Sequence, residues 1–176
     1  MWKRHCRAAN QSRRMKIFLI VSGGILAMTI VLLLVGLILA RLGTPQTADV
    51  ELGVTGGRFV ACPGTPNCVS TMADGDTHVV EPLTYRGSQG EAMDAALEAL
   101  RSLPRVRIIR EVEDYARAEA RTALFRFIDD IEIYIPDGRN VVHFRSASRA
   151  GGGDMGVNRR RYREFRRRFQ RAMGQQ

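Results

Sequence analysis

The segment CPGTPNCVST, residues 62–71, contains two of the three cysteines of the chain. Thiols at the spacing of Cys62 and Cys68 could form a structural disulfide, a redox-active pair or part of a metal site. Redox pairs usually have the C-x-x-C spacing at the start of a helix, which Pro63 and Pro66 disfavour. The chemistry of the pair therefore depends on the compartment that holds it.

A second group of residues that could do chemistry lies further along the chain. The segment FRFIDDIEIYI reads as a strand and places Asp129 on the same face as Phe and Ile side chains, where a carboxylate must be paired, protonated or beside water. The following FRSASRAGGGDMGVNRRR places glycines and arginines before a helix, a composition that can bind an anion. The predicted polar pocket comprises Asp129, Asp130, Arg145, Ser146, Ser148, Arg149, Asp154, Asn158 and Arg159.

The same residues also allow a structural interpretation. Asp154 could cap the final helix, while the arginines pair with Asp129, Asp130 and Glu132 in a buried network that holds the fold together. A β-bulge at the two aspartates would instead turn both side chains outward. Pocket and network therefore remain alternatives at the level of the sequence.

A hydrolytic site is the rival to a binding site. Hydrolysis needs a nucleophile, a base and an orienting group, which Ser146 or Ser148, His143 or His78, and an aspartate could supply. Neither serine lies in a G-x-S-x-G or S-x-x-K motif. The cysteines and histidines match no zinc spacing, and the sequence has neither a P-loop motif nor a nucleotide fingerprint, so no metal and no cofactor is expected.

These groups follow a long apolar segment in the chain. Residues 17–40 contain no charged side chain, and a helix of this length spans the hydrocarbon core of a bilayer. The run is longer than the apolar region of a signal peptide and ends in a poor cleavage site, which favours a membrane anchor. Basic residues are concentrated before it, so the N-terminus is expected in the cytoplasm.

This orientation predicts a single-pass protein of the cytoplasmic (inner) membrane, with its C-terminal domain outside the cytoplasm. The expected parts are a cytoplasmic basic tail over 1–16, a transmembrane helix over 17–40, a linker over 41–51 and an exported domain over 52–173. In an oxidising compartment Cys62 and Cys68 are most simply a disulfide. Cys6 lies on the other side of the membrane and cannot pair with either.

The net charge of +9 is unevenly distributed. Residues 42–156 carry −5, and residues 157–176, with eight arginines and one glutamate, carry +7. The expected location argues against nucleic acid as a partner, although the overall charge is basic. The basic end is expected to be a solvated helix face or to contact a membrane surface, so the expected partners are the lipid bilayer and an anionic ligand or lipid headgroup. The sequence identifies no protein partner.

The exported domain is expected to be α+β, with an antiparallel sheet of about four strands covered by two helices in a two-layer arrangement. Ser88 and Glu91 form a capping box for a helix over 88–104, and apolar residues at helical spacing predict another over 156–173. Strands are expected at 106–111, 115–122, 125–135 and 141–148, with a hairpin turn at 136–140.

Three of these segments together resemble a known family. CPGTPNCVST, FRFIDDIEIYI and RSASRAGGGDMGVNRRR, in this order and spacing, are similar to the bacterial and plastid family called domain of unknown function 1499. The resemblance covers residues 52–171 and implies a membrane-anchored or exported domain without an established activity. By position, its motif residues here are Cys62, Pro63, Pro66, Asn67, Cys68, Asp129, Asp130, Arg145, Ser146, Ser148, Arg149, Asp154, Asn158 and Arg159.

Together these features favour a membrane-anchored module outside the cytoplasm that binds a ligand or supports the cell envelope without catalysis. The alternative is a small hydrolase or transferase that acts on an anionic envelope substrate. Saturable anion binding without turnover would separate the first function from the second.

Overall fold

The computed structural model describes residues 2–42, 51–123 and 126–174. Within the first helix, side chains are described for residues 15–39. The chain divides into two compact units, Met1–Gly43 and Thr44–Gln176. Most of the expected linker over 41–51, and the first residue of the strand expected at 125–135, lie outside the described residues.

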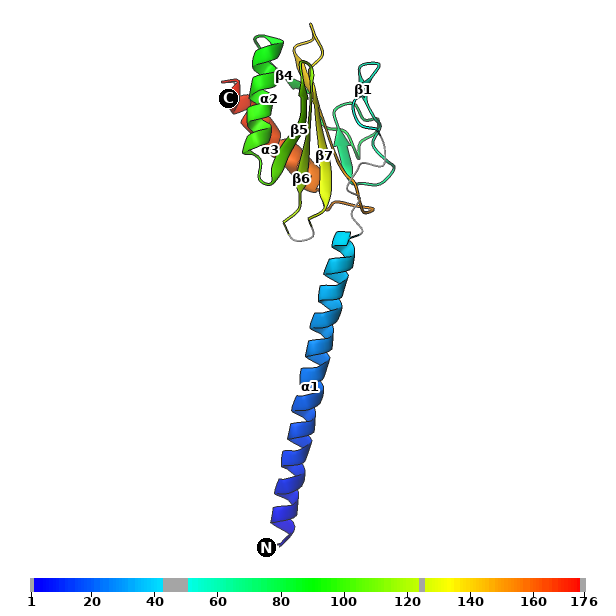
Figure 1. Cartoon of the computed structure of the whole chain (residues 1–176), viewed down its shortest axis with the longest axis vertical. Helices are drawn as coiled ribbons and strands as arrows, with labels where there is room; N and C mark the ends of the chain where they lie inside the picture. The colour runs from blue at the N-terminus through cyan, green and yellow to red at the C-terminus, as the bar shows by residue number, and fades with distance from the viewer. Residues whose placement is uncertain (1, 43–50, 124–125, 175–176) are drawn as a thin grey trace. The chain divides into compact units, whose positions relative to one another are not determined.

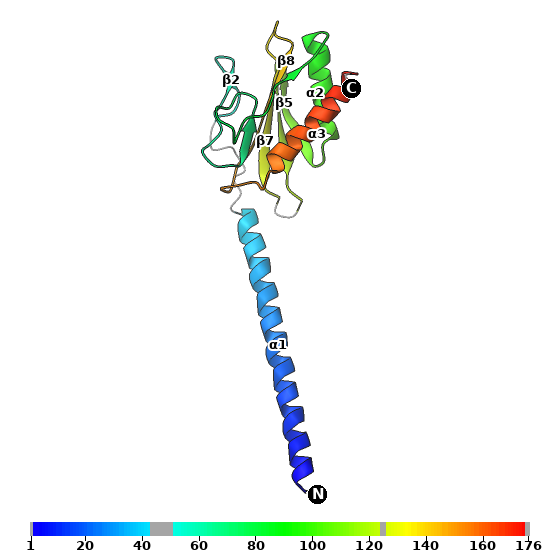
Figure 2. The ribbon, with the colours of Figure 1, turned by 180° about the vertical axis from the view of Figure 1, so that it is seen from behind.

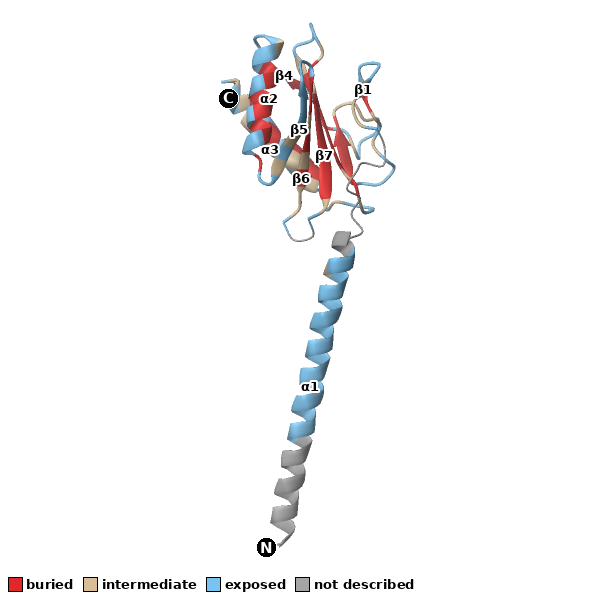
Figure 3. Ribbon diagram, in the orientation of Figure 1, coloured by how far each residue is buried: buried red, intermediate tan, exposed pale blue. Residues whose placement is uncertain are grey.

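The first unit is one long helix, α1, Trp2–Leu42 (Figure 1). Its stretch Met15–Leu39 is apolar enough and, at 25 residues, long enough to cross a membrane. Nearly all side chains described there are exposed, as the pale blue helix in Figure 3 shows. An exposed apolar surface of this size is unfavourable in water, so the helix fits a membrane anchor or a signal sequence.

The second unit contains eight strands among its described residues. They are β1 Val54–Thr55, β2 Arg58–Phe59, β3 Cys68–Ser70, β4 Leu83–Thr84, β5 Val106–Val112, β6 Tyr115–Arg121, β7 Ile128–Tyr134 and β8 Val141–Ser148. A six-stranded sheet has the order β3-β8-β7-β6-β5, with β4 paired to β8, and β1 and β2 form a separate hairpin. All of these pairs are antiparallel, as short turns between sequential strands predict.

The α+β class is confirmed, but the expectation of about four strands is too low. The four expected strands are the long ones, β5 to β8, and their bounds agree with the expected ranges to within a few residues. β1 to β4 contain two or three residues each, too few to show an alternating pattern in the sequence. β7 begins at Ile128 because Arg126 has a φ of 58°, outside the extended region.

Two helices, α2 (Gln89–Ser102) and α3 (Val157–Ala172), lie on one face of the sheet (Figures 1 and 2). The capping box predicted for α2 is present: Ser88 Oγ accepts from the Glu91 amide, and the Glu91 carboxylate accepts from the Ser88 amide. Figure 3 shows that burial is concentrated in the sheet and in the facing side of α2. The core between helices and sheet includes Leu97, Leu100, Ile131, Ile133, Phe144, Tyr162, Phe165 and Phe169.

The opposite face of the sheet carries the segment that contains β1 and β2 (Figure 1). The ring of Phe59 packs edge-on against that of Tyr134, with ring centres 6.3 Å apart. The Gly53 amide also donates a hydrogen bond to the Glu132 carboxylate. The middle strand β7 is therefore covered on both faces, and its polar side chains need partners inside the protein.

A disulfide joins Cys62 and Cys68, whose Cα atoms lie 5.7 Å apart, as the sequence predicted. It closes the loop directly before β3. Within that loop, Asn67 Nδ2 donates to the carbonyl of Gly151 over 2.8 Å. The bond thus fixes a segment of little regular structure beside the Gly-rich loop that leads into α3.

Replacing both cysteines (Cys62→Ser/Cys68→Ser) is expected to lower the free energy of unfolding by about 2 kcal/mol, because the unfolded chain is no longer constrained by a closed loop. Chemical denaturation of the full chain in detergent micelles, followed by tyrosine fluorescence, measures this loss. Reduced wild-type protein should match the variant. Equal stability of the oxidised wild type and the variant would contradict a structural role for the bond.

Candidate functional site

The two adjacent aspartates of β7 point to opposite faces of the sheet. β7 pairs with both neighbours without a bulge, so that Asp129 lies opposite Ser148 and Asp130 lies opposite Ala147. Both aspartates are buried, with 1% and 3% of the surface of the residue exposed. Each aspartate therefore belongs to a different cluster of polar side chains.

On the face away from the helices, Asp130 is held by two arginines. Arg149 donates from Nε to Oδ2 over 2.7 Å and from Nη2 to Oδ1 over 2.8 Å, and Arg117 Nη2 donates to Oδ1 over 2.8 Å. Arg149 Nη2 also donates to Glu119 over 2.6 Å. Burial alone would raise the pKa of Asp130, but the hydrogen bonds from Arg149 and Arg117 outweigh it and hold the pKa below its ordinary value.

Next to this cluster, Glu132 and Arg145 form a second buried pair. Arg145 Nη1 donates to Glu132 Oε2 over 2.9 Å, and the Tyr115 hydroxyl donates to Oε1 over 2.9 Å. Burial raises the pKa of Glu132, and Arg145 and Tyr115 oppose that rise only in part. Arg145 Nε is buried and has no hydrogen-bond partner among the described residues. Arg145 therefore pairs with Glu132 rather than with either aspartate.

On the helix face, Asp129 meets a residue that was not among those predicted for the site. Arg161 of α3 donates from Nη2 to Asp129 Oδ2 over 2.6 Å. Its Nη1 donates to Ser146 Oγ over 3.0 Å and to Asn158 Oδ1 over 2.5 Å, and Ser146 Oγ donates to the same Asn158 oxygen over 2.6 Å. This network ties the first turns of α3 to β7 and β8.

The start of α3 is further fixed by Asp154 and by the cysteine loop. Asp154 accepts from the amides of Gly156 (2.8 Å) and Asn158 (2.6 Å), which satisfies donors in the first turn of the helix. Asn158 Nδ2 donates to the Asn67 carbonyl over 2.9 Å and to Ser148 Oγ over 3.2 Å. The capping role that the sequence offered for Asp154 is therefore present, although the N-cap position itself is Gly156.

The remaining predicted residues do not converge on one place. Arg159 points to the carbonyls of Thr77 and Val79, at 2.8 and 3.0 Å. Ser146 and Ser148 lie on the opposite face of β8 from His143, because their positions differ from that of His143 by three and five, both odd numbers. The arrangement thus brings together Asp130 with Arg149, and Ser146 with Ser148, Asp154 and Asn158, but it forms no Ser–His pair from these residues.

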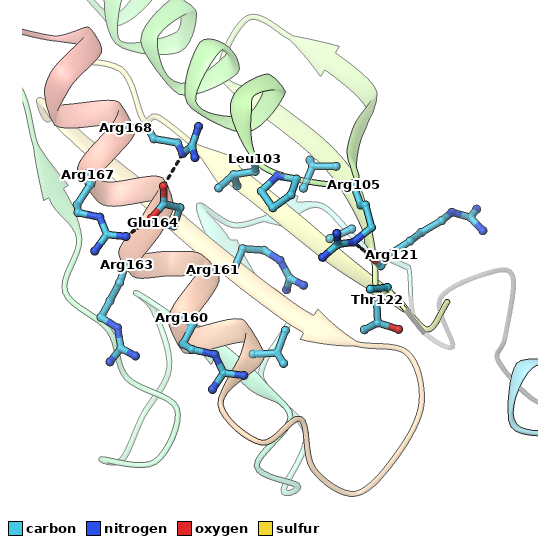
Figure 4. Close-up of a pocket in the computed structure, with 15 residues that line it drawn as sticks. Leu103, Arg105, Arg121, Thr122, Arg160, Arg161, Arg163, Glu164, Arg167 and Arg168 are labelled. Atoms are coloured by element: carbon cyan, nitrogen blue, oxygen red, sulfur yellow. Dashed lines mark hydrogen bonds and ion pairs between the residues drawn. The ribbon is translucent and has the colours of Figure 1, made fainter. Parts of the chain in front are cut away.

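A groove lies beside this network, between α3 and the ends of β5 and β6 (Figure 4). Its volume is about 660 Å³. It includes none of the nine residues predicted for the polar pocket. Its lining residues are Leu103, Pro104, Arg105, Val106, Ala120, Arg121, Thr122, Ala123, Val157, Arg160, Arg161, Arg163, Glu164, Arg167 and Arg168. The groove therefore combines seven guanidinium groups and one carboxylate with an apolar part.

Some of these arginines are already paired within the protein. Arg168 Nε lies 2.7 Å from Glu164, Arg167 contacts the same carboxylate, and Arg161 pairs with Asp129. By contrast, the three arginines at 105, 160 and 163 form no ion pair with another described residue. Figure 4 shows Arg160 and Arg163 projecting from α3 on the same side of the helix as Glu164 and Arg167. These unpaired cations can bind an anion.

Sequence reasoning missed the groove because its residues come from three distant segments. From the sequence, the arginines of α3 are expected on a solvated helix face or at a membrane surface. Arg105 and Arg121, at the ends of β5 and β6, are not among the expected site residues. The one available signal is the spacing of Arg160, Arg163 and Arg167, which places a basic row beside the buried aromatic stripe of α3.

Arg145→Met is expected to lower the free energy of unfolding by about 3 kcal/mol, because Glu132 is then buried without its cation. The double change Arg145→Met/Glu132→Leu should recover a large part of the loss, since neither charge of this pair remains buried. Chemical denaturation measures both. As a control, Arg101→Met removes an exposed pair with Glu111 and should cost less than about 1 kcal/mol. A double variant no more stable than the single one would contradict this account of the pair.

The stabilising effect of Asp130 is expected to depend on pH. Its folded pKa lies below the ordinary 3.8, so its contribution is present above that pH and is lost as the pH falls through the folded pKa. The difference in unfolding free energy between wild type and Asp130→Asn should therefore be full at pH 7 and shrink below pH 3.8. Denaturation curves between pH 7 and pH 2 measure it. A difference that is constant or grows in acid would contradict the pairing.

Comparison with known proteins supports the assignment made from the three motifs. The model of a family described as "Protein of unknown function (DUF1499)" matches residues 58–169. No match was found among curated proteins or among solved structures. The matched region begins at β2, ends within α3, and includes the disulfide, the three buried carboxylate–arginine pairs and every residue that lines the groove. It covers more than half of the chain, which therefore belongs to the DUF1499 family.

Proposed function

We propose that this chain is a membrane-anchored module outside the cytoplasm that binds an anionic ligand in the arginine groove without transforming it. The observation that carries the proposal is the groove itself, which is lined by seven arginines, three of which form no ion pair with another described residue. Its volume of about 660 Å³ lies in the range of small-molecule sites. Guanidinium groups bind phosphate and carboxylate through paired, charge-assisted hydrogen bonds.

The apolar part of the groove favours a ligand that is not purely ionic. Leu103, Pro104, Val106 and Val157 line the same space as the arginines. A phosphate group with an attached apolar chain would contact both the arginines and these apolar side chains, because burial of the apolar chain of the ligand strengthens binding beyond the ionic contacts. An anionic phospholipid, with its phosphate headgroup and acyl chains, has this chemistry, and it is the ligand that we propose.

Membrane anchoring supports the same ligand. α1 is long and apolar enough to span a bilayer, and the Lys and Arg residues before it favour a cytoplasmic N-terminus. A disulfide in the domain is consistent with an oxidising compartment on the other side. A domain held near the membrane in this way would meet lipid headgroups at high local concentration.

The lining of the groove supports binding rather than catalysis. It contains a single hydroxyl, that of Thr122, and no histidine that could activate it. Its one carboxylate, Glu164, is engaged by Arg167 and Arg168, which hold its pKa below the ordinary value. A carboxylate held in this way is a poor general base, because it is paired with cations and weakly basic.

Neutralising Arg105, Arg160 and Arg163 to glutamine is expected to weaken binding of dihexanoyl phosphatidic acid by at least about tenfold, since a charge-assisted hydrogen bond contributes roughly 1.5–3 kcal/mol. Isothermal titration calorimetry of the full chain in non-ionic micelles measures it. Titration with inorganic phosphate measures binding without the acyl chains of the lipid. Titration with the phosphatidylcholine analogue, which has the same acyl chains but no net charge, measures binding without the anionic headgroup.

The matched control is Arg86→Gln/Arg107→Gln/Arg171→Gln, which removes the same charge from exposed positions outside the groove. This variant should retain the affinity of the wild type. Equal weakening in both variants would show that only the overall charge matters. Equal binding of the phosphatidylcholine analogue, or turnover of the lipid, would overturn the proposed function.

A further inference from the structure

A second cavity lies on the opposite face of the sheet, beside the turn between β1 and β2. Its volume is about 530 Å³. Its lining residues are Gly56, Gly57, Arg58, Thr71, Met72, Tyr134, Pro136, Asp137, Arg139 and His143. Gly56 and Gly57 have φ values of 58° and 76°, the left-handed conformation that this tight hairpin turn requires. The cavity shares no residue with the arginine groove, so it raises a separate question of function.

We propose that this cavity is a second ligand site, in which Arg58, Arg139 and His143 bind a small oxyanion such as a carboxylate or a phosphate group. The three side chains come from β2, from the β7–β8 turn and from β8. Neither arginine forms an ion pair with another described residue. Arg58 is oriented by one hydrogen bond, from Nη2 to the Met72 carbonyl over 2.9 Å.

The imidazole of His143 is held in position by its neighbours. Its ring stacks on that of Tyr134, with centres 6.2 Å apart and planes inclined by 20°. Its Nδ1 lies 3.1 Å from Thr71 Oγ1, which also accepts a hydrogen bond from the Phe144 amide. Nε2 makes no hydrogen bond to another described residue and remains available to a ligand.

The charges around His143 favour an anion in this space. Burial and then the two cations Arg139 and Arg58 hold the pKa of His143 below its ordinary value, so the ring is neutral at pH 7. The other titratable groups that line the cavity are Asp137 and Tyr134, and Asp137 is the only carboxylate among them. An anion bound between the arginines would reduce their repulsion of a protonated ring. Binding and protonation of His143 should therefore be linked, each favouring the other.

The test follows His143 by NMR in the full chain, held in micelles and labelled at histidine Cε1. The chain has three histidines, and His143→Gln assigns the resonance. The probes are inorganic sulfate, which keeps its charge over the titration and stands in for phosphate, and acetate. Saturating probe is expected to move the titration midpoint of His143 to higher pH by about half a pH unit or more.

Two variants make the result specific. Arg139→Gln, at an exposed turn, should abolish most of the probe-dependent shift, and Arg58→Gln should do the same. Neutralising Arg105, Arg160 and Arg163 in the groove should leave the shift unchanged. No shift with either probe, or an undiminished shift in Arg139→Gln, would overturn the second site. The proposed lipid site is tested by different residues and probes, so the two can fail independently.

Discussion

The structure depends on how the carboxylates of β7 are neutralised. β7 is the middle strand of the sheet and is covered on both faces. It nevertheless contains three carboxylate side chains, those of Asp129, Asp130 and Glu132, and all three are almost fully buried. An unpaired carboxylate in such a place would be strongly destabilising. Each one therefore has an arginine, and each arginine comes from a different element or loop: α3, the segment after β8, and β8 itself.

This constraint connects parts of the chain that apolar packing alone would leave free to slide. The pair between Arg161 and Asp129 sets the position of α3 along the sheet, and Asn158 links the same helix to Asn67 in the disulfide loop. Hydrogen bonds with fixed donors and acceptors specify one register, whereas aromatic side chains tolerate several. The motif residues of the DUF1499 family found here thus form mainly an internal framework.

The same framework produces the surfaces on which function is proposed. Arg161 is bound to Asp129, and the neighbouring arginines of α3 line the groove between α3 and the ends of β5 and β6. The groove contains more arginines than carboxylates, so its net charge is positive. On the other face, the β1–β2 turn brings Arg58 toward His143. Anion binding is proposed at both places because the fold lines each space with several cations before any ligand arrives.

The sequence by itself determined the elements that depend on local pattern. The uncharged run of α1, the capping box of α2, the aromatic stripe of α3 and the alternation of the long strands each follow from neighbouring residues. Even the cysteine pair could be predicted as a disulfide once its compartment was inferred. Partner choice could not be predicted, because Asp129, Asp130 and Glu132 each had several arginines available. The register of β7 against β8 pairs Arg145 with Glu132, and the placement of α3 on the sheet pairs Arg161 with Asp129. The groove exists only in the tertiary structure, because α3 packs beside the ends of β5 and β6 there.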